Sequence, residues 1–382
     1  MNNEATYWIA LAHLPRWGHL KINNLIIKFY HENKISIEEF FHLSENDWRT
    51  KYSLDEKQIF DLQQAKSELA SNAFLAESFL SQGFELIPIV SPEFSKTLKG
   101  NLKAAHSPAV LYVKGNKKIL EEKSIAIVGS RDASEVALKF TDNIAKLAST
   151  EYEVVVSGFA KGVDKQALDS AINYKGQSII VLPQGIMTFG SGFTKYYKQI
   201  IDGDVLVLST FFPKAPWRAE LAMARNPVIY GLADEIYVAE SAEKGGTWSG
   251  VVDGLRKGRK IFVRKPEPSE KNANYILIQK GAVAVDFSGN IVTKTYDTSP
   301  EQLSIVQESN ESESLDKRIR SVFNGKLLNA EELLEKLNMD WTTKKLIAYL
   351  KKLDFIEVVK EKKINHYKLK EPVGTKQIKL FS

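Results

Sequence analysis

Apolar residues follow two different spacings along the 382-residue chain. Between Tyr7 and Leu80 they recur at steps of three and four residues, which is typical of amphipathic helices. From about Phe84 to Asp286, short runs of β-branched and other apolar residues alternate with helical stretches instead. Six runs are predicted to be strands: Ser124–Val128, Val154–Val156, Ser178–Leu182, Val205–Leu208, Glu235–Val238 and Lys260–Val263. Buried strands that alternate with helices indicate an α/β fold with a doubly wound, Rossmann-like parallel sheet.

The residue composition changes twice more after this region. Residues 291–314 are rich in Ser, Thr, Asn and Glu, and they are predicted to form a flexible linker. Helical patterns then precede two strand patterns, which is the element order of a winged helix-turn-helix. We therefore expect a small N-terminal helical (SAM- or HhH-like) domain at 1–82, the α/β domain at 83–290, a winged-helix-like domain at 315–372 and a tail at 373–382.

Composition narrows the class of protein. The chain has no cysteine, which excludes disulfides, thiolate metal sites and cysteine nucleophiles. Its apolar runs are far shorter than the roughly 18 residues that cross a bilayer, and the N-terminus lacks a signal-peptide pattern. We therefore expect a soluble, cytoplasmic protein without membrane insertion. The net charge of +5 is concentrated after Leu315, where 16 Lys and Arg stand against 9 Asp and Glu. This excess suits contact with nucleic acid, although a solvated basic face explains it equally well.

Candidate chemistry lies in the turns that follow the predicted strands, because ligands of open parallel sheets bind beyond the carboxyl ends of strands. Arg131 follows the first strand, where its planar guanidinium and nearby helix amides suit a phosphate. The second turn, at 157–162, combines glycines, a serine and a lysine, and its amides are predicted to form an anion-binding nest. Asp164 is interpreted as support for the start of the next helix.

Three further segments complete a predicted electropositive groove for a phosphate backbone or a nucleotide. The third turn leads into a loop whose aromatic rings either stack on exposed bases or pack against the sheet. An Arg-Asn pair precedes the apolar run Val228–Leu232, and a Lys-Gly-Gly-Thr turn follows Glu240. The candidate binding residues are Ser130, Arg131, Ser157, Gly158, Lys161, Gln184, Gly185, Phe193, Arg225, Asn226, Lys244 and Gly246.

The sequence lacks the common catalytic and cofactor motifs. It contains no Gly-x-x-x-x-Gly-Lys-Ser/Thr loop, no complete Gly-x-Gly-x-x-Gly and no Gly-x-Ser-x-Gly elbow. None of its six histidines lies in the sheet turns, and no His/carboxylate spacing resembles a zinc or two-metal site. We therefore expect no catalytic residues, no cofactor and no metal.

The order of the turn motifs resembles the DNA-processing protein A (DprA/Smf) family. These motifs are IAIVGSR at 125–131, VVSGFAKGVD at 155–164, and Arg225-Asn226 before IYGLA at 229–233. The segment SPAVLYVKG at 107–115 is similar to the family's segment ahead of its nucleotide-binding-like fold. The flanking helical and winged-helix-like modules agree with the family's organisation.

This resemblance implies a protein that binds single-stranded DNA without catalysing a reaction and helps to load the RecA recombinase onto it. Such proteins act on incoming DNA during natural transformation and in recombination. By the same resemblance, Arg131 and Lys161 match positions that contact the DNA backbone, and Arg225 and Asn226 match the first two residues of an Arg-Asn-Arg motif. A homodimer is also expected.

The chain departs from the family pattern at several positions. Pro227 stands in place of the motif's second arginine, Thr210 in place of a glutamate, and residues 264–268 lack an expected Pro-Gly. Transformation is therefore a weaker expectation than DNA binding. Two alternatives stay open: a sensor that binds a free nucleotide or a defence signal, and a nucleotide-cleaving enzyme of the same superfamily, whose Gly-Gly-x-Gly-Thr loop is shortened here to 245–247.

Overall fold

The structure is a computed structural model that describes residues 4–292, 318–323, 327–337, 339, 341–351, 353, 355–361 and 364–369. The chain divides into two compact units, Met1–Lys294 and Thr295–Ser382. Nearly all of the predicted linker and the whole predicted tail lie outside the described residues.

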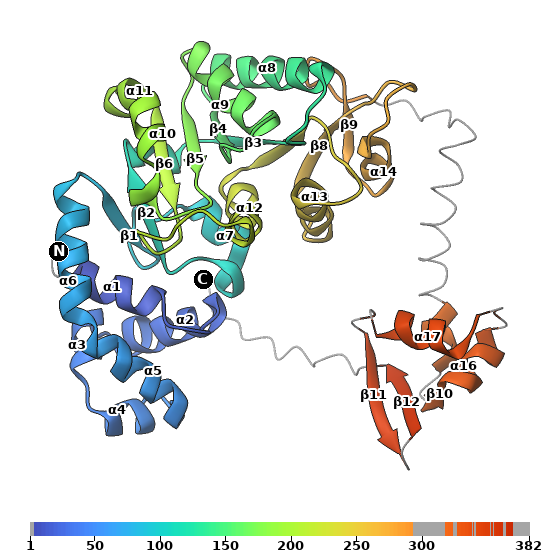
Figure 1. Ribbon diagram of the computed structural model, residues 1–382, viewed down its shortest axis with the longest axis horizontal. Helices are drawn as coiled ribbons and strands as arrows, with labels where there is room; N and C mark the ends of the chain where they lie inside the picture. Colours follow the sequence, from blue (N-terminus) through green and yellow to red (C-terminus); the bar gives the residue numbers. More distant parts are fainter. Residues whose placement is uncertain are drawn as a thin grey trace. The chain divides into compact units, whose positions relative to one another are not determined.

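The first unit begins with the predicted helices (Figure 1). They are α1 (Glu4–Ala12), α2 (His19–Ile26) with its π-helical continuation η1 (Ile27–Glu32), α3 (Ile37–His42), α4 (Glu45–Thr50), α5 (Glu56–Ser67) and α6 (Leu69–Ser81). Capping boxes at Ser36, Ser44 and Asp55 start α3, α4 and α5, because each side chain accepts a hydrogen bond from an otherwise unpaired backbone amide. The apolar core of these helices continues into that of the sheet through Phe84, Tyr112 and Val205.

A nine-stranded sheet follows, in the spatial order β1-β2-β6-β5-β4-β3-β7-β8-β9. Its strands are β1 (Glu85–Pro88), β2 (Val110–Lys114), β3 (Ser124–Val128), β4 (Val154–Ser157), β5 (Ser178–Val181), β6 (Val205–Ser209), β7 (Glu235–Val238), β8 (Lys260–Arg264) and β9 (Val283–Val285). The strands from β6 to β9 are parallel, whereas β2 runs against both of its neighbours. All six predicted strands are present, and of this sheet the sequence analysis missed the outer strands β1, β2 and β9.

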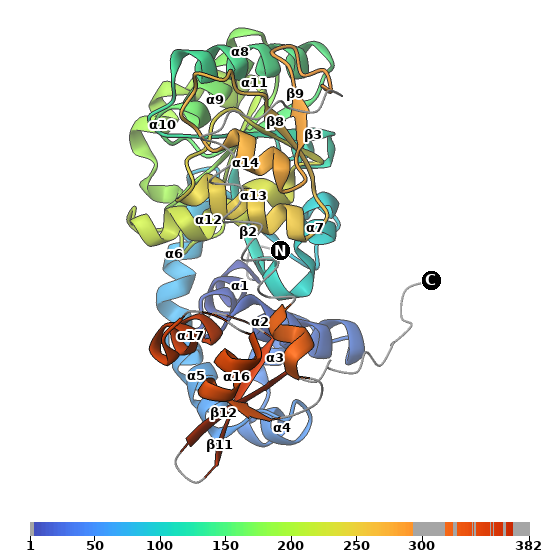
Figure 2. The same ribbon diagram turned by 90° about the vertical axis from the view of Figure 1, so that its right-hand side faces the viewer.

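Helices cover both faces of this sheet (Figures 1 and 2), so the predicted doubly wound, Rossmann-like α/β fold is confirmed. One face packs against α7 (Lys96–His106), α12 (Ala219–Leu232), α13 (Gly246–Arg256) and α14 (Asn274–Gln279). The other packs against α8 (Glu135–Thr150) and α9 (Val163–Asn173), while η3 (Ile186–Thr188), α10 (Gly190–Lys195) and α11 (Tyr197–Asp202) lie between β5 and β6 in the chain. A 3-10 turn, η2 (Lys117–Glu121), precedes β3. The chain order reverses between β3 and β7, which is where such folds bind ligands.

The second unit has the predicted winged-helix-like order. Helical residues 318–323 precede α16 (Ala330–Leu337) and α17 (Thr343–Leu350), and a small sheet follows in the order β10-β12-β11. Its strands are β10 (Leu328–Asn329), β11 (Ile356–Glu361) and β12 (Ile364–Leu369). Leu333, Leu346 and Tyr367 join these elements in one apolar cluster.

Candidate nucleic-acid interface

Five neighbouring parallel strands, β7, β3, β4, β5 and β6 in this spatial order, end at the same edge of the sheet. The segments that follow them carry, in the same order, Lys244, Arg131, Lys161, Gln184 and Trp217. Neighbouring strands lie about 4.8 Å apart, so the five strand ends span about 19 Å. Two hollows adjoin along this edge, with volumes of about 360 Å³ and about 420 Å³, and Arg131 lines both. We call the two hollows together the edge groove.

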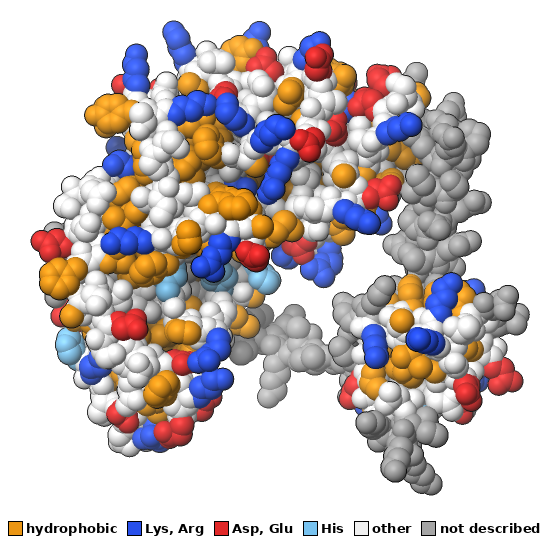
Figure 3. Space-filling view, viewed as in Figure 1, with side chains coloured by type: hydrophobic (Ala, Val, Ile, Leu, Met, Phe, Trp, Pro, Cys, Tyr) orange, Lys and Arg blue, Asp and Glu red, His pale blue; other side chains and the backbone are white. Residues whose placement is uncertain are grey.

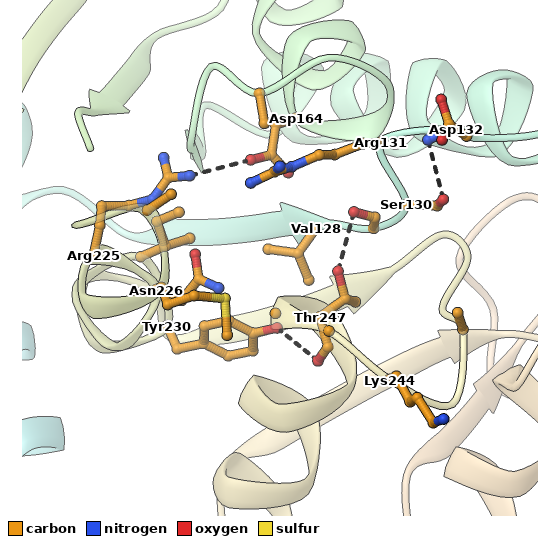
Figure 4. Close-up of a pocket in the computed structure, with 18 residues that line it drawn as sticks. Val128, Ser130, Arg131, Asp132, Asp164, Arg225, Asn226, Tyr230, Lys244 and Thr247 are labelled. Atoms are coloured by element: carbon orange, nitrogen blue, oxygen red, sulfur yellow. Dashed lines mark hydrogen bonds and ion pairs between the residues drawn. The ribbon is translucent and has the colours of Figure 1, made fainter. Parts of the chain in front are cut away.

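The first hollow opens between the turns after β3 and β7, at the reversal of strand order (Figure 4). Main-chain contacts hold these two turns together: the Ser130 amide donates to the Glu240 carbonyl oxygen at 2.9 Å. The Thr247 hydroxyl donates to the Gly129 carbonyl oxygen at 3.0 Å, and the Tyr230 hydroxyl donates to the Thr247 carbonyl oxygen at 3.3 Å. The Ser130 amide is therefore already paired, which leaves its hydroxyl as the group that can donate to a ligand.

Exposed cations stand along the edge groove. Arg131 makes no hydrogen bond or ion pair with any described residue, and Figure 4 shows its guanidinium pointing across the hollow toward Asp164. The Lys161 ammonium lies 3.2 Å from the Asp132 carboxylate, but these side chains are 82% and 90% exposed. Since such pairs contribute at most about 1 kcal/mol, a phosphate can replace this carboxylate at little cost. Lys244 is also exposed, at the far side of the first hollow.

Arg225 lies on α12, and it is not an exposed cation: its side chain is only 4% accessible. It donates to the carbonyl oxygen of Val181 at 2.6 Å and to that of Gly158, and it lies 3.8 Å from the Asp164 carboxylate. Burial raises the pKa of Asp164 and lowers that of Arg225, while the opposite charge of each partner works against both shifts. Both printed hydrogen bonds of the guanidinium go to main-chain oxygens, and its buried Nε has no partner among the described residues. We therefore interpret Arg225 as a support for the edge groove.

The turn after β4 contains its own anion. The amides of Gly158 and Ala160 donate to the Asp164 carboxylate, which occupies the position that the sequence analysis assigned to a bound phosphate. Ser157 is fully buried, and its hydroxyl donates to the Ile127 carbonyl oxygen at 2.8 Å. A Cβ atom on Gly158 would overlap both Arg225 and Asp164, so glycine is needed there for packing. Ser157 is therefore a buried support of the turn, whereas Gly158 lines the second hollow. The anion-binding nest stays a prediction.

Asn226 and Gly246 meet across the first hollow. The Asn226 amide makes no hydrogen bond with the described residues, and it lies against the Cα of Gly246, where a Cβ atom would overlap it. Pro227 follows inside α12 and removes one backbone donor from the helix. The amide of Asn226 is thus available to a ligand.

The three candidates from the third turn separate in the structure. Gln184 lines the second hollow, and its side-chain amide donates to the Thr188 hydroxyl at 2.8 Å. Gly185 is buried beneath the loop after β6 and does not line the hollow. The Phe193 ring packs against those of Phe84 and Phe189, with centroids 5.5 and 5.4 Å away. This position favours the packing alternative for Phe193, and its ring does not line the second hollow.

Sequence reasoning missed Trp217 and Thr247 as lining residues. Thr247 stood inside the Lys-Gly-Gly-Thr turn, so the motif contained the signal. Trp217 lies in the loop after β6, which contains no glycine. Only its position after the end of a parallel strand could have indicated that it lines the site.

Metal ligation and membrane insertion find no support in the described part of the chain. No group of three His, Asp or Glu side chains there is arranged to hold a metal ion. None of the described helices is both long and apolar enough to cross a bilayer.

Comparison with known proteins settles the family. The model of the DNA recombination-mediator protein A family matches residues 85–295, which include the whole sheet and the edge groove. The chain belongs to this family. The expected resemblance is thereby confirmed. The DNA processing protein DprA of Streptococcus pneumoniae is 30% identical over 191 residues, which are 49% of this chain and 67% of that protein. The Bacillus subtilis DprA is 29% identical over 215 residues, 54% of this chain and 70% of that protein.

A solved structure supports the same assignment. The X-ray structure of the Streptococcus pneumoniae DprA matches this structure with a TM-score of 0.60 and 25% identity. The match covers 75% of this chain and 94% of that one, so this family fold extends well beyond the motif-bearing turns.

Proposed function

We propose that this protein binds single-stranded DNA along the edge groove and acts as a recombination mediator in the processing of incoming DNA. The observation that carries the proposal is the placement of Arg131 and Lys161, two exposed cations at the ends of adjacent strands, beside connected hollows. A strand stacked as in duplex DNA offers one phosphate charge per about 3.4 Å, so a groove of about 19 Å accommodates at most roughly five phosphates. Membership of the DNA recombination-mediator family supports the same substrate class.

The proposed contacts divide by chemistry. Arg131, Lys161 and Lys244 neutralise phosphates, and the Ser130 hydroxyl and the Asn226 and Gln184 amides donate hydrogen bonds to phosphates or base edges. Gly246 allows the strand to approach Asn226 closely. Arg225, Ser157, Gly158 and Gly185 hold the loops in place.

Several wider features belong to the proposal as well. We propose that the protein loads the RecA recombinase onto the bound strand, that it acts in the cytoplasm as a homodimer, and that it needs no catalytic turnover. The division into domains at 1–82, 83–290 and 315–372 is part of the same organisation. Family membership and the charge of the edge groove support these features.

The test is a titration of fluorescent oligo-dT with the double variant Arg131→Ala/Lys161→Ala. We expect weaker binding to every sequence and a salt dependence whose slope falls by roughly 0.7 for each lost phosphate contact. Lys257→Ala, which removes an exposed-face lysine paired with Asp253, is the matched control. If the double variant binds oligo-dT like the parent at low salt, DNA lies elsewhere.

A second function is favoured by one observation, the free Asn226 amide beside the N-terminus of α13 in the first hollow. Such a hollow suits the phosphate of a mononucleotide. A competition experiment distinguishes the two functions. Displacement of oligo-dT by a mononucleotide at micromolar concentration supports a nucleotide sensor, whereas displacement only by longer strands supports single-strand binding along the edge groove.

A further inference from the structure

Trp217 differs from the other described tryptophans. Its side chain is 56% exposed, whereas Trp8 and Trp48 lie in the core of the N-terminal helices, and Trp341 in the second unit contacts Tyr349 and Lys345. Among the described residues, no ring and no cation packs on the indole of Trp217. A large apolar face is thus left open to solvent where it lines the second hollow.

The loop that carries Trp217 is fixed at its base. The Gly185 amide donates to the Ala215 carbonyl oxygen at 2.8 Å, and the Met187 amide donates to the Pro213 carbonyl oxygen at 3.0 Å. The Ala215 amide in turn donates to the Phe212 carbonyl oxygen at 2.8 Å. Gly185 is required for this arrangement, because a Cβ atom there would overlap the carbonyl oxygens of Phe212 and Pro213.

Proline at 213 and 216 restricts the same loop further, since the ring fixes one backbone angle of each residue. Trp217 follows immediately after this restrained segment. Ordering of the loop therefore costs little when a ligand binds, which is the condition under which an exposed aromatic side chain contributes affinity.

The neighbours of Trp217 supply the other half of a nucleotide site. Arg131 and Lys161 line the same hollow, and so does Gln184, whose side chain carries both a donor and an acceptor. A flat ring beside two cations matches a base next to its own phosphates. An apolar ligand without an anionic group would make no use of these two cations.

We propose that Trp217 is a stacking platform for one nucleobase of the bound single strand, whose adjacent phosphates are held by Arg131 and Lys161. This inference rests on the proposed function and specifies how the edge groove holds a base as well as a backbone. Stacking is sequence-tolerant because every base has a flat face, so the platform suits a protein that binds strands of any sequence.

The experiment compares oligo-dT with an abasic oligonucleotide of the same length, using the full chain. We expect Trp217→Ala to bind oligo-dT about 5-fold to 150-fold more weakly, the range found when one base–aromatic stack is removed. Its salt dependence keeps the parent slope, because no phosphate contact is lost. The abasic strand binds the parent and Trp217→Ala equally, and Trp217→Phe retains most of the affinity for oligo-dT.

A second readout is the quenching of tryptophan fluorescence when oligo-dT is added, which Trp217→Ala should abolish. Phe74→Ala removes an aromatic side chain of 75% exposure on α6 and serves as the matched control, with unchanged binding. Equal binding of oligo-dT by Trp217→Ala and the parent overturns the platform, and so does an equal loss on the abasic strand. If the parent itself fails to bind oligo-dT, the proposed function is what has failed.

Discussion

The guanidinium of Arg225 lies 3.8 Å from the Asp164 carboxylate and also donates to the main chain at Gly158 and Val181. One buried cation from α12 thus ties together the ends of β4 and β5 and the first turn of α9. Because the same turns carry Lys161 and Gln184, this link determines the spacing of the groups that line the edge groove.

The first prediction concerns the contribution of Arg225 to the stability of the fold. Arg225→Met leaves the Asp164 carboxylate buried without its cation, and loss of one partner from a buried pair costs about 3–5 kcal/mol of unfolding free energy. Chemical denaturation of the variant measures this loss. Arg218→Ala, at the exposed start of the same helix, should change stability by less than about 0.5 kcal/mol.

A double variant distinguishes support from direct contact. Arg225→Met/Asp164→Asn removes both charges, so we expect it to recover much of the stability that the single variant loses. If Arg225 acts only as a support, the folded double variant binds oligo-dT within about threefold of the parent, a difference below about 0.7 kcal/mol. A folded double variant that has lost binding would show that Arg225 contacts DNA directly.

These residues show how much of the site the sequence predicts. The turns after the strands were predictable, because parallel strands end at one edge and their short motifs contain glycine and cations. The sequence did not predict which residue of each motif faces the groove, because Arg225 and Arg131 are both arginines in short polar motifs. Only the fold shows that Arg225 is buried at the wall of both hollows with its guanidinium on main-chain oxygens, while the Asn226 amide at the first hollow has no hydrogen-bond partner among the described residues.

The second prediction concerns pH. His13 is half-buried and follows α1 where this helix meets the sheet, and its Nε2 lies 2.9 Å from the Tyr112 hydroxyl. Burial raises the pKa of Tyr112, so the hydroxyl stays protonated and shares a hydrogen bond with the His13 imidazole. Burial and nearby His19 lower the pKa of His13 to about 4, and Figure 3 shows histidines gathered at this junction.

Because the folded-state pKa is lower than the ordinary value of about 6.5, the contribution of His13 is complete above pH 6.5. It is lost as the pH falls toward 4, by about 1.4 kcal/mol per pH unit. Between pH 8 and 5 the parent should therefore lose about 2 kcal/mol more unfolding free energy than His13→Gln. Denaturant titrations at both pH values give the difference. Equal losses in the two proteins would mean that His13 titrates normally.

The third prediction concerns Gly185, which lies under the loop of Trp217. Gly185→Ala pushes a Cβ atom against the carbonyl oxygens of Phe212 and Pro213, so the loop must shift. Overpacking of this kind costs about 1–3 kcal/mol, and we expect affinity for oligo-dT to fall along with stability. Gly190→Ala is the control, because no atom lies within 4 Å of its added Cβ. Unchanged binding by a folded Gly185→Ala protein would contradict the role assigned to the loop.

The fold was more predictable than the site, and the exceptions have physical reasons. The central strands β3 to β6 are buried on both faces, so their continuous apolar runs identify them. In contrast, β1 combines glutamate with proline, and β9 has three residues. The shared core of α1–α6 and the sheet was also not visible in sequence, because amphipathic spacing shows that a helix packs but not against what.

The fourth prediction concerns the two units. Arg131, Lys161 and Trp217 all lie in the unit Met1–Lys294, so a chain that ends at Lys294 should bind oligo-dT within about threefold of the full chain, a difference below about 0.7 kcal/mol. Binding to duplex DNA tests the second unit, where Lys344 and Lys345 are exposed on α17. We expect the shortened chain to lose any duplex affinity. Loss of oligo-dT binding by the shortened chain, with its circular dichroism intact, would place the single-strand site in the second unit.

The fifth prediction is that the protein turns over neither DNA nor nucleotides. Cleavage requires a positioned acid–base pair, a nucleophile or metal ligands. Three carboxylates near the groove motifs already have partners. Asp132 lies 3.2 Å from the Lys161 ammonium, and Asp164 lies 3.8 Å from the Arg225 guanidinium. The Glu240 carboxylate accepts a hydrogen bond from the Ser134 hydroxyl at the start of α8. Labelled single-stranded DNA, ATP and nucleoside monophosphates should remain intact with or without magnesium, and product formation that disappears in Glu240→Gln would establish an enzyme instead.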